Sequence, residues 1–249
     1  MIGPPPPGAT AVRLLSVKSL SELSATSKIL HLIRHAEGTH NLCEIESKKP
    51  IHHDAKLTTK GKDQCFNLSS KTRSLAVEAV LVSPTTRCLE TATLSFQHCI
   101  DQIGTPDVPF IAYEEWRETV NYLCDSRRSI DALKTEFRHV DFQFVTDNHD
   151  PLWHKYEEQF GSHTDHTTLR ESNDPSGLYN RAHSAWRILL SRPERELALV
   201  GHSAFFMHMF TPLFDELEGL VSYEDSIVEE IMRDRFDNCE LRTVVVDQP

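Results

Sequence analysis

Short apolar runs alternate with helix-like stretches from residue 28 onward. Apolar side chains dominate 29–33 and fill 79–82 and 197–200, and a polar residue or a glycine ends each run. Runs of this length without polar alternation are typical of strands that are buried on both faces of a parallel sheet. We therefore predict three buried strands at these positions and a further strand at 243–246.

The intervals between these strands carry helical patterns. Thr58 or Thr59 is suited to cap one helix, and Ser83 followed by Pro84 predicts the start of a second helix that runs to residue 96. Asp174 and Pro175 open a third helix, with apolar residues on one face up to residue 189. This alternation predicts an α/β domain with a mostly parallel sheet.

Residues 120–172 do not follow this rhythm. They combine a short helical pattern, an alternating apolar stretch at 140–144 and a polar segment, and we interpret them as an insertion over the functional edge of the sheet. Residues 1–27 have the composition of a Pro-rich N-terminal extension. We therefore predict a single domain over residues 28–249.

Composition narrows the functional classes. The chain has 249 residues, and 26 Lys and Arg against 37 Asp and Glu leave a formal charge of −11. This charge argues against a general nucleic-acid binder, which needs a basic face. No apolar run approaches the roughly 18 residues of a membrane span, and the six cysteines contain no CxxC pair. We expect a cytoplasmic protein with reduced thiols and with neither a nucleic acid nor a membrane as partner. The oligomeric state stays open.

The residues that end the three buried strands carry the candidate chemistry. Arg34-His35 follows the first strand, Arg87 lies just beyond the second, and Gly201-His202 follows the third. Ligands of open α/β sheets bind at the carboxyl ends of the strands, so we expect two guanidinium groups and two imidazoles to converge there. Such a cluster favours an anion, and arginine is well matched to phosphate oxygens. We expect Gly201 to supply an unusual backbone conformation for the turn into the next helix.

An imidazole in such a pocket is a candidate nucleophile toward phosphorus. Its second nitrogen has to be fixed by a hydrogen bond, and the departing alkoxide needs a proton from a nearby carboxyl group. Five acids lie near predicted strand ends and are candidates for this group: Glu37, Asp54, Glu114, Glu115 and Glu118.

The order of these residues resembles a known family. Leu32-Ile33-Arg34-His35-Ala36-Glu37, with Asn41 six residues after His35, resembles the RHG signature of the histidine phosphatase superfamily, whose fold is phosphoglycerate mutase-like. The similarity continues to about residue 210 through these segments: Leu57-Thr58, Gly61, Gln64, Val82-Ser83-Pro84, Arg87, Thr91-Ala92 and Val200-Gly201-His202-Ser203. Arg117-Glu118, Cys124-Asp125 and Arg127-Arg128-Ser129 further resemble a fungal and plant branch of phosphoglycerate mutase-like proteins. Ala36 and Gly38 depart from the residues that many members carry there.

The resemblance implies a three-layer α/β/α sandwich and assigns roles to individual residues. His35 becomes the nucleophile that forms a phosphohistidine, and Glu118 becomes the acid that protonates the leaving group and then activates water. Glu118 follows a strand at 108–112 in this branch. Five residues are implied to bind the substrate: Arg34, Asn41, Arg87, His202 and Ser203. The resemblance implies no metal and no cofactor, and the expected partner is a small phosphorylated substrate.

These residues are compatible with more than one function. The first is a phosphatase that hydrolyses a phosphomonoester through the covalent intermediate on His35. The alternatives are a phosphomutase of the phosphoglycerate mutase type, a non-catalytic phosphate-binding module, and a non-phosphatase enzyme recruited on the same fold. Arg127 and Arg128 either bind a second anionic group of the substrate or face solvent. We interpret 52–54 and the pair His163 and His166 as loop residues, because neither group has a metal-site pattern.

Overall fold

One eight-stranded sheet organises the part of the chain that the computed structural model describes. This part comprises residues 12–15, 24, 26–42, 52–101, 104–162, 170–210 and 221–247, so Pro4–Pro7, His163 and His166 lie outside it. The strand order is β5-β4-β3-β6-β2-β8-β1-β7, and all neighbours are parallel except that β8 runs antiparallel to β2 and β1. The strands are β1 Val12–Leu15, β2 Lys28–Arg34, β3 Ala79–Val82, β4 Phe110–Ala112, β5 Val140–Asp141, β6 Glu196–Gly201, β7 Val221–Tyr223 and β8 Leu241–Asp247.

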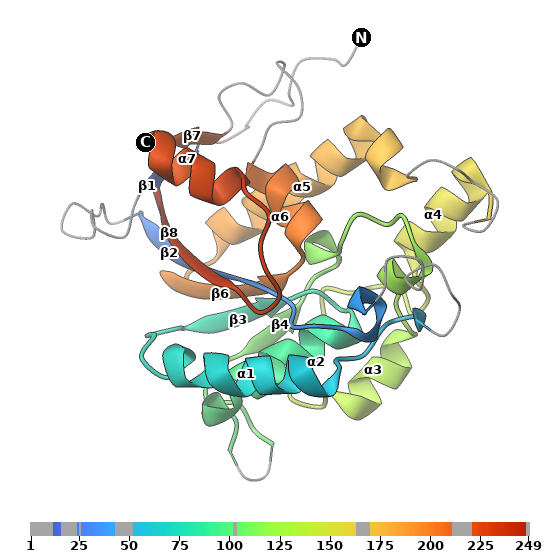
Figure 1. The fold of residues 1–249 in the computed structure, drawn as a ribbon, viewed down its shortest axis with the longest axis horizontal. Coiled ribbons are helices and arrows are strands. Elements are labelled where there is room, and N and C mark those ends of the chain that lie inside the picture. The colour runs from blue at the N-terminus through green and yellow to red at the C-terminus, as the bar shows by residue number, and fades with distance from the viewer. Residues whose placement is uncertain are drawn as a thin grey trace.

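Helices cover both faces of the sheet, which gives the three layers that the resemblance implies (Figure 1). Helices α1 to α3 lie on one face and α5 to α7 on the other, and α4 lies beside them. Their bounds are α1 Thr59–Thr72, α2 Thr86–Ser95, α3 Ile130–Glu136, α4 Pro151–Phe160, α5 Pro175–Ser191, α6 Ser203–Phe210 and α7 Ser226–Arg233. Short 3-10 helices lie at η2 Thr39–Asn41, η5 Gln97–Cys99, η6 Glu114–Trp116, η7 Leu123–Asp125 and η8 Glu171–Asn173.

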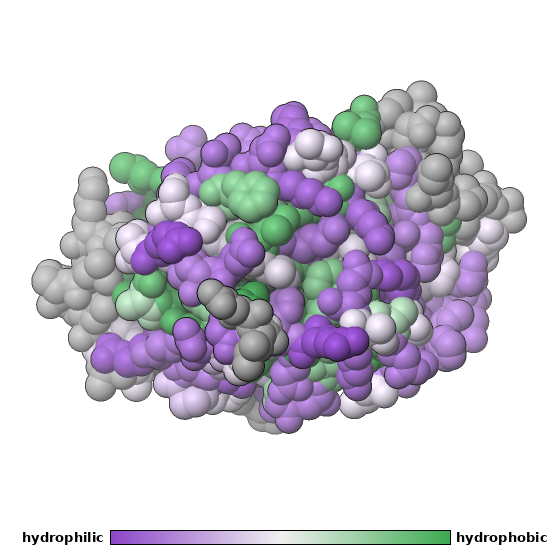
Figure 2. Space-filling model, turned by 90° about the horizontal axis from the view of Figure 1, so that it is seen from below, coloured by the Kyte–Doolittle hydropathy of each residue, from purple (hydrophilic) through white to green (hydrophobic). Residues whose placement is uncertain are grey.

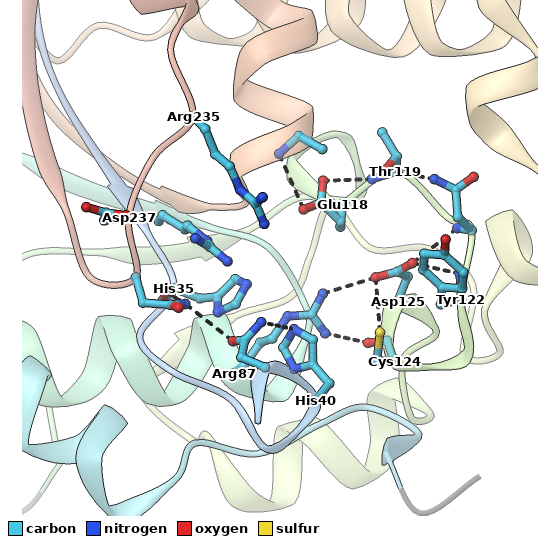
Figure 3. A pocket seen from close by; sticks show the side chains of 15 residues that line it. His35, His40, Arg87, Glu118, Thr119, Tyr122, Cys124, Asp125, Arg235 and Asp237 are labelled. Carbon is cyan, nitrogen blue, oxygen red and sulfur yellow. Dashed lines mark hydrogen bonds and ion pairs between the residues drawn. The ribbon is translucent and has the colours of Figure 1, made fainter. Parts of the chain in front are cut away.

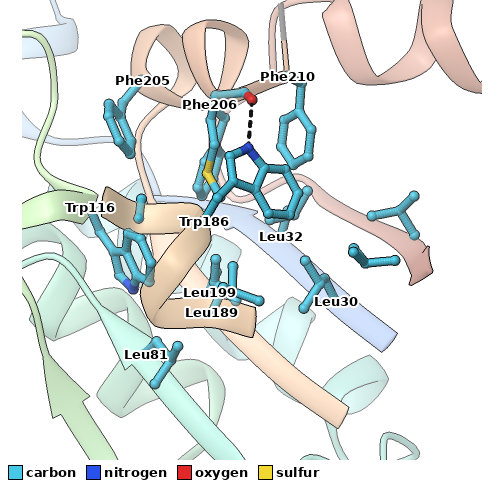
Figure 4. Packing of buried hydrophobic residues seen from close by; sticks show 14 of the residues in the cluster. Leu30, Leu32, Leu81, Trp116, Trp186, Leu189, Leu199, Phe205, Phe206 and Phe210 are labelled. Carbon is cyan, nitrogen blue, oxygen red and sulfur yellow. Dashed lines mark hydrogen bonds between the residues drawn. The ribbon is translucent and has the colours of Figure 1, made fainter. Parts of the chain in front are cut away.

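Each face of the sheet has its own apolar core. On the side of α5 and α6, Trp186 packs edge-on against Phe210, with 5.6 Å between ring centroids, and its indole N–H donates to the Met209 carbonyl (3.0 Å) (Figure 4). On the other side, Phe96 and Leu133 close a second cluster over β3 and β4. Because both faces are covered, the central strands contain almost only apolar residues.

The face of the molecule shown in Figure 2 is mostly polar. On this face, hydrophobic residues form small separate groups among hydrophilic ones. Among the described residues, no helix is long and apolar enough to cross a bilayer.

The predicted strands and most helix starts are confirmed. β3 has the predicted bounds, β2, β6 and β8 each extend a predicted run by one to three residues, Thr58 caps α1 and Asp174 caps α5. The predicted start of α2 is wrong, because Thr85 is the residue before its first turn and the Ser83 hydroxyl instead faces a histidine. The strands β1 and β7 were not predicted.

The N-terminal segment contributes to the sheet. β1 lies within the predicted extension of residues 1–27, yet it pairs with both β8 and β7. Leu14 is fully buried there. The sheet therefore includes residues that lie before residue 28, the domain boundary predicted from the sequence.

Gly201 is required for a different reason from the one predicted. Its φ is not positive, so its backbone is open to other residues. A Cβ atom at this position would lie 2.9 Å from the ring of Phe206. Close packing of α6 against the end of β6 therefore accounts for the glycine.

Candidate active site

The carboxyl ends of three neighbouring strands meet at one edge of the sheet. In the parallel pair β2–β6, Arg34 lies opposite Gly201, so His35 and His202 are the first residues beyond the paired ends. The His35 backbone N–H donates to the Gly201 carbonyl (2.9 Å), and the two imidazole centroids lie 5.1 Å apart. The neighbouring strand β3 leads into α2, whose first turn carries Arg87. Backbone register thus brings four residues from distant parts of the chain together.

His35 is a neutral imidazole, and one of its ring nitrogens has no hydrogen-bond partner among the described residues. Its side chain is buried, and Nδ1 lies 2.8 Å from the Ala36 carbonyl. A carbonyl can only accept, so Nδ1 carries the proton and Nε2 keeps its lone pair. Burial lowers the pKa of His35 well below its ordinary value, and the charge of Arg87 lowers it further. The free Nε2 is therefore available as a nucleophile at neutral pH.

His202 and Arg87 form a buried pair next to His35. Arg87 Nη2 donates to His202 Nδ1 (3.2 Å), and Nε2 of the same ring lies 3.0 Å from the Ser83 hydroxyl. An arginine can only donate, so Nδ1 of His202 accepts and Nε2 holds the proton. Burial, followed by the charge of Arg87, lowers the pKa of His202 well below its ordinary value. His202 is therefore a neutral ring that orients Arg87.

Two guanidinium groups keep unused donors at this edge of the sheet. Arg34 Nη1 donates to the Phe236 carbonyl (2.7 Å), and Arg87 Nη1 donates to the Cys124 carbonyl. The Nε atoms of both arginines are buried and have no hydrogen-bond partner among the described residues. Buried N–H groups are normally paired. Both arginines also line the pocket described below, and an anion with several acceptor oxygens complements their charge. A phosphoryl group has this chemistry.

Arg34, His35 and Arg87 line a pocket of about 900 Å³ (Figure 3). This volume lies within the range of roughly 300–1,000 Å³ that is common for small-molecule sites. We call Arg34, His35, Arg87 and His202 the inner end of the pocket. The outer rim consists of pocket-lining residues from two segments, one after β4 and one before β8: Glu118, Thr119, Asn121, Tyr122, Cys124, Asp125, Arg235, Asp237 and Asn238. His202 itself is fully buried behind this lining.

Glu118 faces His35 across the pocket (Figure 3). Its Oε1 accepts from the backbone N–H groups of Thr119 (3.0 Å) and Phe205 (2.9 Å), and Oε2 has one longer contact with the Ala204 N–H (3.4 Å). These bonds tie the carboxylate to the first turn of α6. Because Oε2 has only this one long contact, it is the oxygen of Glu118 that is better suited to exchange a proton with a ligand.

The other four candidate acids are engaged elsewhere. Glu37 pairs with Lys60 (2.7 Å), and Asp54 accepts from Arg128 (2.9 Å). Glu114 accepts from Arg117 (3.0 Å) and from Arg127, and Glu115 lines a shallow depression away from this pocket. Of the five candidate acids, Glu118 is the one that lines the pocket.

A buried arginine holds the backbone that carries Glu118. Arg181 on α5 donates to the carbonyls of Glu115 (3.1 Å), Arg117 (2.6 Å) and Glu118 (3.2 Å). Its guanidinium also pairs with Glu171 (2.7 Å). Arg117 points away from the pocket and pairs with Asp150 (2.8 Å). Ion pairs, and not sheet register, therefore position this side of the site.

Asp125 is a second carboxyl group in the pocket, which sequence reasoning did not assign. It accepts from the backbone N–H groups of Asn121 (3.1 Å) and Tyr122 (2.8 Å), and Oδ1 lies 3.5 Å from Arg87 Nη2. Burial raises its pKa to about 6, although Arg87 opposes this shift. Asp125 and His202 therefore both contact Nη2 of Arg87, and Asp125 lies beside Arg87 in the pocket (Figure 3).

Several predicted residues lie outside the pocket. The Ser203 hydroxyl accepts from the Phe236 N–H (3.0 Å), so it anchors the loop before β8. Arg127 donates to the carbonyls of residues 147–149, and Arg128 donates to Asp54 and Thr86. Neither arginine lines the pocket. Arg127 is buried, and Arg128 is partly exposed but paired with Asp54 and Glu136. Both hold the insertion against the domain.

Other pocket residues were missed from sequence. Asn41 lines the pocket as predicted, and its Oδ1 accepts from Asn238 (3.3 Å). The adjacent His40 also lines it, with its ring centroid 5.4 Å from that of His35, and burial lowers its pKa to about 2. The position of His40 within the RHG-like segment is the sequence feature that could have indicated its place in the pocket. Arg235 and Asn238 had no such feature, because they lie about two hundred residues from His35 in the chain.

Comparison with known proteins agrees with this geometry. Residues 30–127 match the histidine phosphatase superfamily (branch 1). A phosphoglycerate mutase-like protein of Arabidopsis thaliana is 28% identical over 255 residues, which cover 88% of this chain and 84% of that protein.

Solved structures share the fold. The ecdysone phosphate phosphatase of Bombix mori superimposes with a TM-score of 0.52 at 16% identity over 87% of this chain and 88% of that one. The alpha-ribazole phosphatase of Shigella flexneri gives 0.50 at 15% identity over 86% and 89%. Residues 30–127 therefore carry the match to the histidine phosphatase superfamily, and the described part of the chain shares the fold of these phosphatases.

Proposed function

We propose that this protein is a phosphatase that hydrolyses a small phosphomonoester through a phosphohistidine on His35. The observation that carries the proposal is the neutral His35, whose free Nε2 lies in one pocket with two arginines that have unused donors. The acid that the chemistry needs, Glu118, lines the same pocket.

In the first step, His35 Nε2 attacks the phosphorus atom. The N–P bond forms as the ester P–O bond breaks, and Glu118 gives its proton to the departing alkoxide. Arg34 and Arg87 stabilise the negative charge on the phosphoryl oxygens, because their donors are already in place before the reaction. The hydrogen bond from Nδ1 to the Ala36 carbonyl holds the ring as it becomes cationic.

In the second step, water replaces the imidazole. Glu118, now a carboxylate, takes a proton from water as the oxygen attacks phosphorus. The N–P bond breaks, inorganic phosphate leaves, and His35 returns to its neutral form. Atoms and charges balance over the two steps, and the chain's own residues supply every proton transfer.

The test combines trapping of the intermediate with the fate of the phosphoryl group. We expect the wild type to release inorganic phosphate from one or more esters of a metabolite panel and to form an acid-labile phosphohistidine. His35→Ala should lower turnover by at least about 1,000-fold. His154→Ala, an exposed histidine on α4, is the matched control and should retain activity.

The alternatives give different outcomes. Retention of the radiolabelled phosphate on an isomerised product would indicate a mutase and not a phosphatase. Binding of phosphate esters without turnover or phosphohistidine would indicate a non-catalytic module.

A further inference from the structure

Arg235 is the third arginine of the pocket and is placed differently from the other two. It lies on the loop between α7 and β8, is exposed, and extends toward the space between His35 and Glu118 (Figure 3). Among the residues that the structure describes, its guanidinium has no hydrogen bond and no ion pair, whereas Arg34 and Arg87 both donate to backbone carbonyls.

The loop that carries Arg235 is anchored on both sides. Phe236 is fully buried, its N–H donates to Ser203 (3.0 Å), and its carbonyl accepts from Arg34 (2.7 Å). Asn238 donates to the His35 carbonyl (3.1 Å) and to Asn41 (3.3 Å). Arg235 is therefore a free side chain on a fixed backbone, which lowers the cost of ordering it around a ligand.

The charge of Arg235 acts on the outer part of the site. Burial lowers the pKa of Arg34, and among the nearby charges Arg235 also lowers it. The charges that lower the pKa of His35 are instead those of Arg87, His40 and Arg34. Arg235 therefore lies near Arg34 but outside the group that surrounds the nucleophile.

Asp237 lies on the same loop as Arg235, and its carboxylate is a candidate to form an ion pair with the Arg235 guanidinium. No ion pair joins the two side chains in the described structure, and the Asp237 carboxylate points away from the Arg235 guanidinium (Figure 3). The arginine stays available to a ligand.

We propose that Arg235 binds a second anionic group on the leaving-group portion of the substrate. This inference rests on the proposed function and adds a specificity-determining residue to it. A phosphoryl group fills a small part of a pocket of about 900 Å³ and uses the donors of Arg34 and Arg87. A leaving group that extends past Glu118 meets Arg235, and a carboxylate or a second phosphate there gains a charge-assisted hydrogen bond. Arg127 and Arg128, the sequence candidates for this role, are held elsewhere.

Three esters with the same carbon skeleton test the proposal. Glycerol 1-phosphate, 3-phosphoglycerate and glycerol 1,3-bisphosphate differ at the far carbon, which carries a hydroxyl, a carboxylate or a phosphate. Their affinities are measured by calorimetry in the His35→Ala background, so that the result does not depend on turnover. We expect Arg235→Gln to weaken the binding of 3-phosphoglycerate, of glycerol 1,3-bisphosphate or of both, the ligands with a second anionic group, by about ten-fold. Glycerol 1-phosphate should change little. Whether the carboxylate or the phosphate ligand loses more identifies the group.

Two control variants separate charge from structure. Arg235→Lys should retain most of the preference, because it keeps the charge. Arg187→Gln, an exposed arginine on α5 outside this pocket, should leave all three affinities unchanged.

Two results would overturn the proposal. An equal loss of affinity for all three ligands would show that Arg235 contacts the transferred phosphoryl group. Unchanged affinities for all three would show that Arg235 does not bind the substrate. Failure of the proposed function is a separate result. It would be seen as the absence of phosphohistidine in the wild-type protein, and it does not depend on the affinities measured in the variants.

Discussion

The inner end and the outer rim of the pocket are built by different kinds of interaction. At the inner end, His35 and His202 extend directly from paired strands, and backbone hydrogen bonds hold them in register. At the rim, Glu118 lies on irregular backbone that the guanidinium of Arg181 holds through three carbonyls. Arg235 lies on a loop that is pinned through its neighbour Phe236.

This difference separates the chemistry from the choice of substrate. Strand ends of a covered sheet are rigid, because a displacement there breaks several ladder hydrogen bonds and core contacts at once. The rim depends on a few ion pairs and loop contacts, so single substitutions alter it without changing the sheet. We therefore expect changes at the inner end to affect all substrates and changes at the rim to discriminate among them.

Within the rim, the largest effect should come from Glu118, the residue that takes part in the reaction. Glu118→Gln should lower kcat/KM for an alkyl phosphate by about 100- to 10,000-fold, because the leaving alkoxide loses its proton donor. The loss should be much smaller for 4-nitrophenyl phosphate, whose phenolate departs without a proton. Steady-state kinetics with both esters measures the contrast.

The neighbouring acid is the control for this comparison. Glu115→Gln should behave like the wild type toward both esters, because Glu115 lies outside the pocket. Equal losses for the two esters in Glu118→Gln would contradict the assignment of Glu118 as the acid.

A smaller effect should follow when the support of the rim is removed. Arg181→Gln leaves Glu171 buried without its partner, and we expect a loss of about 3 kcal/mol in the free energy of unfolding. Turnover of alkyl phosphates should fall because Glu118 loses its backbone support. Phosphohistidine formation from 4-nitrophenyl phosphate should persist, because the inner end does not depend on Arg181.

Chemical denaturation and intermediate trapping together check this prediction. Arg187→Gln, six residues further along the same helix, removes an exposed charge and should have neither effect. Loss of phosphohistidine formation in folded Arg181→Gln would show that the two ends of the pocket are not independent.

The smallest effect is that of a single histidine on the pH dependence of stability at the inner end. The imidazoles of His35 and His202 at the inner end, and that of the adjacent His40, have pKa values lowered by burial first and by nearby charges second. They stay neutral in the folded protein while unfolded histidines take up protons near pH 6.5. The free energy of unfolding should therefore fall as the pH falls below about 6.5, with a slope approaching about 1.4 kcal/mol per pH unit for each such histidine.

Urea denaturation between pH 7 and pH 5 measures this slope. His40→Asn removes one of the three groups and should reduce the slope by up to about 1.4 kcal/mol per pH unit. Saturating inorganic phosphate should also flatten it, because a bound anion favours protonated imidazoles. An unchanged slope in His40→Asn would place the pH dependence elsewhere in the molecule.

Local patterns were reliable where burial or capping chemistry dominates. The run at 79–82 is apolar on both faces and becomes β3, and Thr58 and Asp174 cap helices because their side chains accept from backbone N–H groups three residues ahead. The start of α2 was misplaced because Ser83 has a competing partner, His202, that is 119 residues away. The short strands β1 and β7 escaped prediction, since each has a polar residue within its three or four positions, unlike the wholly apolar β3.

The sequence by itself determined the alternation of strands and helices, the order of the signature residues, and therefore the inner end of the pocket. Those residues follow directly from strand ends, and parallel pairing leaves little freedom in where they point. The tertiary structure decided which acid faces His35, that Arg127 and Arg128 serve the scaffold, and that Arg235 reaches the pocket. These outcomes depend on contacts between residues far apart in the chain, and no local pattern of side chains encodes such contacts.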